Sequence, residues 1–227
     1  MTDLSALLNP EQLEAATAPD GPLLILAAAG TGKTRTLVYR VVHLVERGYS
    51  PSELMLITFT NRAAREMLAR AEGVAAGITS GLWGGTFHHI ANRILRKYGP
   101  RIGYPQDFTI LDADDQKSLM GHCIKAEGLT PKTFPKKEVV LGLVSGAANR
   151  GIDFGDYLET KREGLEADPD AVMRVANAYF RRKLDMHAMD FDDLLVKGLA
   201  LLAEHEDVRR YYQERFRHVL VDEYQDT

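Results

Sequence analysis

The fold is decided by residues 24–36, which read Leu-Ile-Leu-Ala-Ala-Ala-Gly-Thr-Gly-Lys-Thr-Arg-Thr. The apolar run at residues 23–27 predicts a short buried strand, and apolar side chains at helical spacing begin at Leu37. A loop of small residues lies between them. Such a loop directs main-chain N–H groups into one concavity at a helix N-terminus, which suits a phosphate chain. The order strand, loop, helix therefore predicts a phosphate-binding loop.

Two side chains of this loop have the chemistry that a nucleoside triphosphate requires. Lys33 would reach the β- and γ-phosphates, and the Thr34 hydroxyl would hold Mg²⁺. The generic pattern, Gly-x-x-x-x-Gly-Lys-Ser/Thr, has a glycine where this chain has Ala27, so the match is incomplete at one position. The alternative is an ordinary Gly-Thr-Gly turn at the start of a helix.

Composition fits a soluble globular protein of one large domain or two small ones. The chain has 227 residues, of which 45% are hydrophobic and 26% are charged. A formal net charge of -4 means that any nucleic-acid site must be a local basic stripe. The single cysteine, Cys123, excludes an internal disulfide and a cysteine-based metal cluster. We find no membrane-spanning run and no signal sequence, and we expect a cytoplasmic protein.

A helix start is predicted upstream of the loop. Asn9 suits the N-cap, Pro10 the first helical position, and Gln12 the third, from which a side chain reaches back in a capping box. The Gln12 amide both donates and accepts, so it could instead read the edge of an adenine base. The residues themselves leave both roles open.

Strands and helices alternate after the loop, which predicts a parallel sheet with crossover helices. Residues 54–59 and 82–86 predict strands, and Asn61 is expected to cap the helix that follows the first of them. Phe59 and His88 lie near the carboxyl ends of these strands, where function is expected. Polar residues at i, i+4 spacing after Thr86 could track nucleic-acid phosphates, although the spacing alone favours a solvated helix face.

Two further stretches complete the chain. The strand signal stops between residues 112 and 185, which predicts a helical insertion whose helices are separated in part by a glycine-rich stretch at residues 151–164. Residues 219–227 read Val-Leu-Val-Asp-Glu-Tyr-Gln-Asp-Thr, an apolar strand that ends in two acids. Asp222 could hold Mg²⁺ beside the phosphate loop, and Glu223 could deprotonate the water that attacks the γ-phosphate. Taken alone, the two acids could be a solvated strand end.

Six short motifs occur in order along the chain. They read Asn-Pro-Glu-Gln (9–12), Ala-Ala-Ala-Gly-Thr-Gly-Lys-Thr (27–34), Ile-Thr-Phe-Thr-Asn-Arg-Ala-Ala (57–64), Gly-Thr-Phe-His (85–88), Met-Asp-Phe-Asp-Asp-Leu-Leu (189–195) and Asp-Glu-Tyr-Gln-Asp-Thr (222–227). This set resembles the UvrD/PcrA/Rep helicases of superfamily 1, over essentially the whole chain. The chain departs from the family at Ala28, where glycine is usual, and at Arg62, where lysine is common.

The resemblance implies a P-loop (RecA-like) α/β fold, a parallel sheet flanked by helices with an all-helical insertion domain. Residues 1–111 and 186–227 would form the motor domain 1A, incomplete at its C-terminus, and residues 112–185 the accessory domain 1B.

The resemblance also implies roles for individual residues. Gln12 would read adenine, and the rest of the nucleotide would be bound by Ala27, Ala28, Ala29, Gly30, Thr31, Gly32, Lys33, Thr34 and Arg35. Thr34 and Asp222 would hold Mg²⁺. Catalysis would rest on Lys33, Asp222, Glu223 as the general base and Gln225 as the γ-phosphate sensor. Phe59, Asn61, Thr86 and His88 would line the path of single-stranded DNA.

The implied activity is ATP-driven 3′ to 5′ translocation on single-stranded DNA, with unwinding at single/double-strand junctions in replication-linked repair and repair proteins as partners. In the family, a second motor domain supplies arginines that contribute roughly 10³ to 10⁵ in rate. We therefore expect this chain alone to bind Mg-ATP and to turn it over slowly.

Two other classes share part of the pattern. A small P-loop kinase would use the same loop, but it normally ends within about 200 residues and has no use for the Asp-Glu-Tyr-Gln-Asp motif. A non-catalytic ATP- and DNA-binding module is the second alternative, if the natural chain stops at Thr227.

Overall fold

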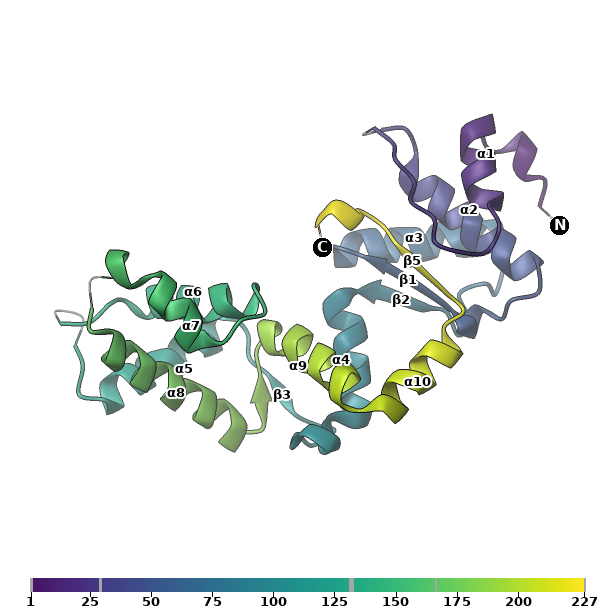
Figure 1. Ribbon diagram of the computed structural model, residues 1–227. Coiled ribbons are helices and arrows are strands. Elements are labelled where there is room, and N and C mark those ends of the chain that lie inside the picture. Colours follow the sequence, from purple (N-terminus) through teal and green to yellow (C-terminus); the bar gives the residue numbers. More distant parts are fainter. Residues whose placement is uncertain (1, 29, 131–132, 166, 227) are drawn as a thin grey trace. The chain divides into compact units, whose positions relative to one another are not determined.

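A computed structural model describes residues 2–28, 30–130, 133–165 and 167–226 (Figure 1). The chain divides into two compact units, one formed by Met1–Ile90 with Glu206–Thr227 and the other by Ala91–His205. The domain boundaries expected at residues 111 and 186 both fall inside the second unit. None of the described helices is long and apolar enough to cross a membrane.

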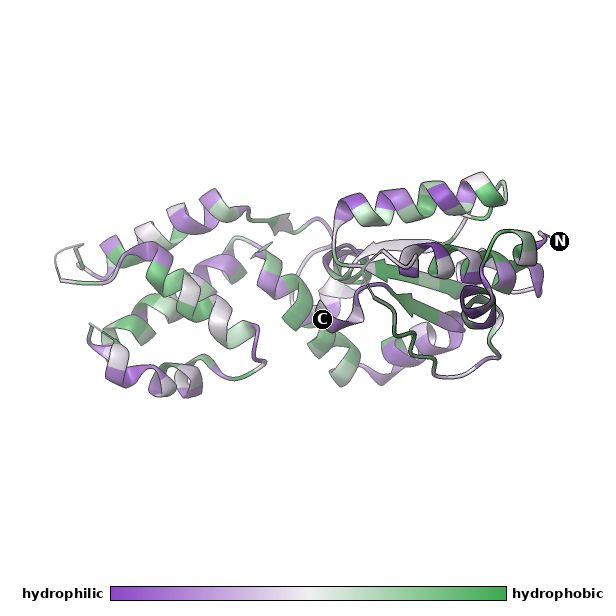
Figure 2. Ribbon diagram, turned by 90° about the horizontal axis from the view of Figure 1, so that it is seen from above, coloured by the Kyte–Doolittle hydropathy of each residue, from purple (hydrophilic) through white to green (hydrophobic). Residues whose placement is uncertain are grey.

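The first unit is built on a parallel three-stranded sheet. β1 (Leu54–Thr58) lies between β2 (Trp83–Thr86) and β5 (His218–Val221). Thr58 pairs with Thr86, and Ile57 pairs with Val221, so the three strands end at one edge of the sheet. The strands are predominantly hydrophobic (Figure 2). The parallel sheet predicted from the alternating pattern is confirmed.

Helices cover both faces of this sheet. α2 (Lys33–Glu46) and α3 (Asn61–Val74) lie on one face and α10 (Glu206–Arg215) on the other, while α1 (Pro10–Thr17) packs against α2. α4 (Phe87–Tyr98) begins directly after β2 and continues into the second unit. Apolar side chains of α2 and α3 pack with Leu54 and Leu56 of β1. Trp83, which pairs with Met55 and so lies on the opposite face, contacts Tyr212 of α10 at 5.7 Å between ring centroids.

The strand predicted at residues 23–27 is absent, and that prediction was wrong. Residues 22–28 form no regular secondary structure, and Leu24 and Leu26 are 68% and 86% exposed. A strand needs a hydrogen-bonded neighbour. β5 pairs with β1 along one edge, and within the described ranges no strand lies along its other edge. The apolar run therefore lacks the pairing that would convert its strand propensity into a strand.

The second unit is predominantly helical. Its elements are α5 (Ala113–Ala126), α6 (Lys137–Ala148), α7 (Phe154–Thr160), α8 (Pro169–Asp185), α9 (Phe191–Glu204) and a parallel pair of short strands, β3 (Thr109–Ile110) and β4 (Ala188–Met189). Apolar residues of α5 to α8 share one core. The separator predicted at residues 151–164 was partly wrong, because α7 lies within it. Asp153 caps this helix, and Phe154, Tyr157 and Leu158 are buried.

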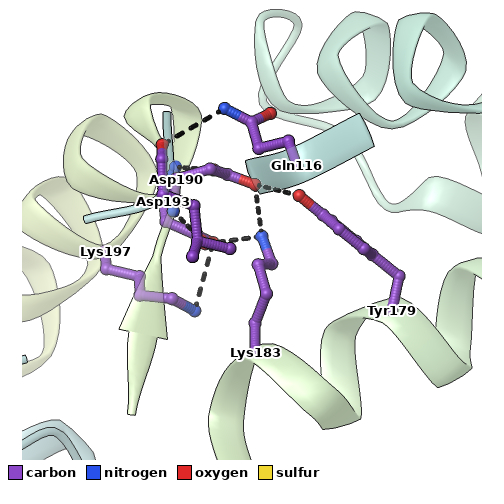
Figure 3. A network of polar contacts seen from close by, with 7 residues as sticks. Gln116, Tyr179, Lys183, Asp190, Asp193 and Lys197 are labelled. Carbon is purple, nitrogen blue, oxygen red and sulfur yellow. Dashed lines mark hydrogen bonds and ion pairs between the residues drawn. The ribbon is translucent and has the colours of Figure 1, made fainter. Parts of the chain in front are cut away.

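A buried charge network joins α8 to the start of α9 (Figure 3). Lys183 Nζ donates to Asp190 Oδ2 at 2.6 Å and to Asp193 Oδ2 at 2.5 Å, and Tyr179 OH donates to Asp190 Oδ2 at 3.0 Å. Burial opposes the charge of Lys183, but the two carboxylates outweigh it and raise the pKa of that ammonium group. Asp190 also accepts from Asp193 N at 2.8 Å, which caps α9. The network therefore fixes the position at which α9 begins.

Candidate functional site

The loop before α2 has the backbone of an anion-binding loop. Gly30 and Gly32 have φ angles of 80° and 91°, in the left-handed region that favours glycine. Gly32 is the N-cap of α2 and has no side chain to satisfy the first N–H groups of the helix. Those N–H groups, at the positive end of the helix dipole, remain available to an anion.

A cavity of about 300 Å³ lies at this helix start. Its walls are Ala28, Gly30, Gly32, Lys33, Thr34, Arg35, Arg70 and Glu223. Three of these side chains, those of Lys33, Arg35 and Arg70, are cations, and only Glu223 is an acid. The positive side chains outnumber the acid, and main-chain N–H groups lie beside them at the helix start. Together they suit a polyphosphate.

Local hydrogen bonds hold the loop together. Thr31 Oγ1 donates to Ala28 O at 2.7 Å, and Lys33 Nζ donates to Ala27 O at 3.4 Å. An ammonium group has three donors, so this long bond leaves donors of Lys33 for a ligand. Ala29, which was predicted to belong to the same loop, lies outside the described residues.

The structure brings the loop and the strand-end acids together. Thr34 Oγ1 donates to Asp222 Oδ2 at 3.2 Å, across 188 residues of sequence. Asp222 follows β5, is only 5% exposed, and donates through its N–H to Ile57 O at 2.8 Å. Two hard oxygen ligands side by side fit Mg²⁺, which usually takes its other ligands from water and phosphate. The described residues contain no group of three His, Cys, Asp or Glu side chains that could hold a metal ion.

Burial raises the pKa of Asp222, and the hydrogen bond from Thr34 only partly offsets this. Because the folded state binds the proton more tightly than the unfolded chain, the free energy of unfolding falls as the pH rises through the interval between the two pKa values. Above that interval the ionised carboxylate destabilises the fold unless a cation is bound. This is the environment in which a divalent cation binds favourably.

We expect Asp222→Asn to raise the melting temperature of the nucleotide-free chain at neutral pH. The amide keeps an acceptor for Thr34 and removes the buried charge, and a gain of about 1 kcal/mol corresponds to roughly 2–4 °C. Thermal unfolding with and without Mg²⁺ checks this, since Mg²⁺ should stabilise the wild type and not the variant. A lower melting temperature for the variant in the absence of Mg²⁺ would show that the carboxylate is not strained by burial.

Glu223 lines the same cavity. Its φ angle of 52° is in the left-handed region, where a non-glycine residue is strained. Its Oε2 lies 3.9 Å from Lys33 Nζ and accepts a hydrogen bond from Gln225 Nε2. Contacts at one edge of the sheet therefore link all four predicted catalytic residues, which are Lys33, Asp222, Glu223 and Gln225.

Gln12 contacts both its own helix and the loop. Its Oε1 accepts from Asn9 N at 3.2 Å, and Asn9 Oδ1 accepts from Gln12 N at 2.8 Å, so the predicted capping box is present. Its Nε2 donates to Thr31 O at 2.8 Å. The role of Gln12 toward adenine stays a prediction.

Two arginines extend the site. Arg35 donates to Leu7 O at 2.7 Å and lies over the ring of Tyr39. Arg70, which the sequence did not single out, lies on α3 beside Glu66 and reaches the cavity from a different element. One arginine among several charged residues of a helix carries no local signal, so only the packing of α3 reveals it.

The predicted DNA-contacting residues lie at or just after the carboxyl ends of two adjacent strands of the first unit. Phe59, just after β1, is 58% exposed, and Asn61 is also exposed. The predicted cap was wrong by one residue, because Thr60 Oγ1 accepts from Ala63 N at 3.1 Å. Thr86 is buried, and its hydroxyl accepts from His89 N at 3.2 Å. His88 is half-buried in α4. Their contact with DNA stays a prediction.

Comparison with known proteins points to one family. Residues 8–227 match the family described as the UvrD/REP helicase N-terminal domain. The ATP-dependent DNA helicase PcrA of Staphylococcus epidermidis (strain RP62A) is 38% identical over 228 residues, which cover 100% of this chain and 31% of that protein. PcrA of Staphylococcus aureus (strain Mu50) is 38% identical over 221 residues, covering 97% of this chain and 30% of that protein. The chain thus spans about a third of the length of these relatives.

Proposed function

The chain belongs to the UvrD/REP helicase family, and from that membership we propose that it is the ATP-binding part of a DNA helicase motor. Residues 1–111 and 186–227 would be the P-loop (RecA-like) motor domain 1A, and residues 112–185 the helical insertion domain 1B. The larger protein would move 3′ to 5′ on single-stranded DNA and unwind it at junctions, in repair and replication. Relatives of this chain carry the name ATP-dependent DNA helicase, which supports the proposal.

One observation carries the ATP-binding part of the proposal. The contact between Thr34 Oγ1 and Asp222 Oδ2 joins the phosphate loop to the strand end 188 residues away. A turn that merely began a helix would not need a buried acid beside its hydroxyl, since burying a carboxylate costs free energy. In a site for a cation and a polyphosphate, the bound cation would compensate the buried charge of Asp222.

Each residue of the site would then have a separate task. Lys33, Arg35 and Arg70 would bind phosphate oxygens, together with the N–H groups at the start of α2. Thr34 and Asp222 would hold Mg²⁺, which when bound neutralises phosphate charge. Glu223 would accept a proton from the water whose oxygen attacks the γ-phosphorus, as the bond to the β-phosphate oxygen breaks and ADP leaves. Gln225, bonded to Glu223, would orient that carboxylate.

The DNA-binding part rests on exposed residues that follow β1. Phe59 presents most of its ring to solvent, which is costly for an aromatic residue unless a base stacks on it. Asn61 is exposed two residues farther along the same chain segment. His88 follows the neighbouring strand, with which β1 pairs in register through Thr58 and Thr86.

We expect Phe59→Ala to weaken single-stranded DNA binding by about 1–3 kcal/mol, because one base loses its stacking partner. Fluorescence anisotropy with a labelled oligonucleotide measures this. Leu199→Ala is a matched control, since Leu199 is 72% exposed in the second unit and would contact no base. Equal affinities for the wild type and the Phe59 variant would remove this residue from the proposed DNA path.

A nucleotide assay separates the helicase motor from the kinase alternative. The chain should bind ATP in the presence of Mg²⁺ and transfer no phosphate to a nucleoside monophosphate. Transfer of the γ-phosphate to such an acceptor would overturn the proposal, because a helicase site directs that phosphate only to water.

A further inference from the structure

The Gln12 side chain lies directly against the phosphate loop. Its Nε2 donates to Thr31 O at 2.8 Å, and a Cβ atom added at Gly32 would lie only 2.7 Å from the same nitrogen. The glycine at this position therefore makes room for the amide. Gly32 also lines the cavity, so the amide of Gln12 contacts a residue of the cavity wall.

The hydrogen bond from Gln12 to Thr31 O fixes the orientation of the whole Thr31–Gly32 peptide. The Thr31–Gly32 peptide is trans and planar, so its C=O and N–H point in opposite directions. When Gln12 holds the carbonyl oxygen, the Gly32 N–H must point away from Gln12. That N–H belongs to the N-cap residue of α2, where an anion would be bound.

Gln12 has enough donors and acceptors to keep its bond to Thr31 O while it also contacts a base. A glutamine amide has two N–H donors and two acceptor lone pairs. The structure uses one donor on Thr31 O and one lone pair on Asn9 N. One donor and one acceptor remain, which is the number that the N7 and N6 edge of adenine requires. By this count, recognition of a base is compatible with the bond to the loop.

On this basis we infer that Gln12 is a positioning residue for the phosphate loop, which couples base recognition to phosphate binding through one amide. The inference rests on the proposed ATP site and goes beyond it. A residue that only reads adenine would not affect a ligand without a base. A residue that orients the Thr31–Gly32 peptide affects every ligand that the loop binds.

Mg-tripolyphosphate, which has phosphates and no base, separates the two roles. By calorimetry, Gln12→Ala should weaken its binding by about two- to tenfold, the usual effect of losing one hydrogen bond. Binding of Mg-ATP should weaken further, because the base contact is lost as well. Asn9→Ala is the matched control: it removes the side-chain cap of α1 and leaves the Gln12–Thr31 bond in place. It should lower the melting temperature and leave tripolyphosphate affinity unchanged.

The outcomes are distinct. Tripolyphosphate affinity that is unchanged or tighter in Gln12→Ala, with weaker ATP binding, would overturn the coupling and leave the proposed ATP site intact. If Asn9→Ala weakens tripolyphosphate binding as much as Gln12→Ala does, the effect belongs to the helix cap and the inference fails. A wild-type chain that binds neither ligand would overturn the proposed function itself.

Discussion

Lys33→Ala is expected to weaken Mg-ATP binding by about 2–5 kcal/mol, roughly 30- to 5,000-fold in Kd. Lys33 is the first residue of α2 and lines the cavity, and among the described residues its ammonium group contacts Ala27 O through a long hydrogen bond and Glu223 as an ion pair. Its removal takes away the cation beside Glu223 and leaves that carboxylate facing the phosphates without a positive charge to balance it. Calorimetric titration with ATP measures the loss.

Two variants sharpen this test. Lys33→Arg keeps the positive charge and should recover part of the affinity, although a guanidinium group differs in shape from an ammonium group. Lys117→Ala removes an exposed lysine of the second unit and should leave ATP binding unchanged. If Lys33→Ala binds ATP as the wild type does, the loop is an ordinary helix start and the proposed site is wrong.

Glu223→Gln is expected to keep ATP binding and to lower turnover by a factor of about 10² to 10⁴, the usual contribution of a general base. Glutamine has nearly the same shape and can still accept from Gln225, but it cannot take a proton from water. The effect should therefore appear in turnover and not in Kd. A single-turnover assay with labelled ATP suits the slow hydrolysis that we expect of this chain.

The binding measurement is the internal control for that variant. The wild-type carboxylate lies 3.9 Å from Lys33, so its neutralisation should leave ATP binding unchanged or slightly tighter. Equal losses of binding and turnover would mean that Glu223 supports the shape of the site, as its strained backbone would also allow. Full turnover in the variant would assign the proton transfer to another group.

The parts of the molecule that the sequence predicts well are those encoded locally. The Gly-Thr-Gly-Lys-Thr loop needs glycines for its backbone angles and a helix start behind it, and both requirements are visible in consecutive residues. The capping box of Asn9 and Gln12 is local in the same sense. The pairing of Thr34 with Asp222 is not local, and the sequence predicts it only through chemistry, because a Mg²⁺ site needs a hydroxyl and a carboxylate side by side.

What the sequence does not predict depends on partners elsewhere in the fold. Residues 23–27 have the composition of a strand, yet β5 offers them no pairing in the structure, and Leu24 and Leu26 stay exposed. Arg70 reaches the cavity only because of the way α3 packs. The one-residue error at Thr60 has a simpler cause, since threonine and asparagine are both good caps and only the hydrogen bond distinguishes them.

The central claim is that the phosphate loop and the buried acid after β5 form one ATP site. A calorimetric titration of this chain with ATP, with and without Mg²⁺, tests it most directly. We predict saturable binding at one site per chain that weakens markedly when Mg²⁺ is removed, because no cation would then separate the Asp222 carboxylate from the phosphates. Absence of ATP binding under both conditions, from a chain that is folded by circular dichroism, would contradict the account.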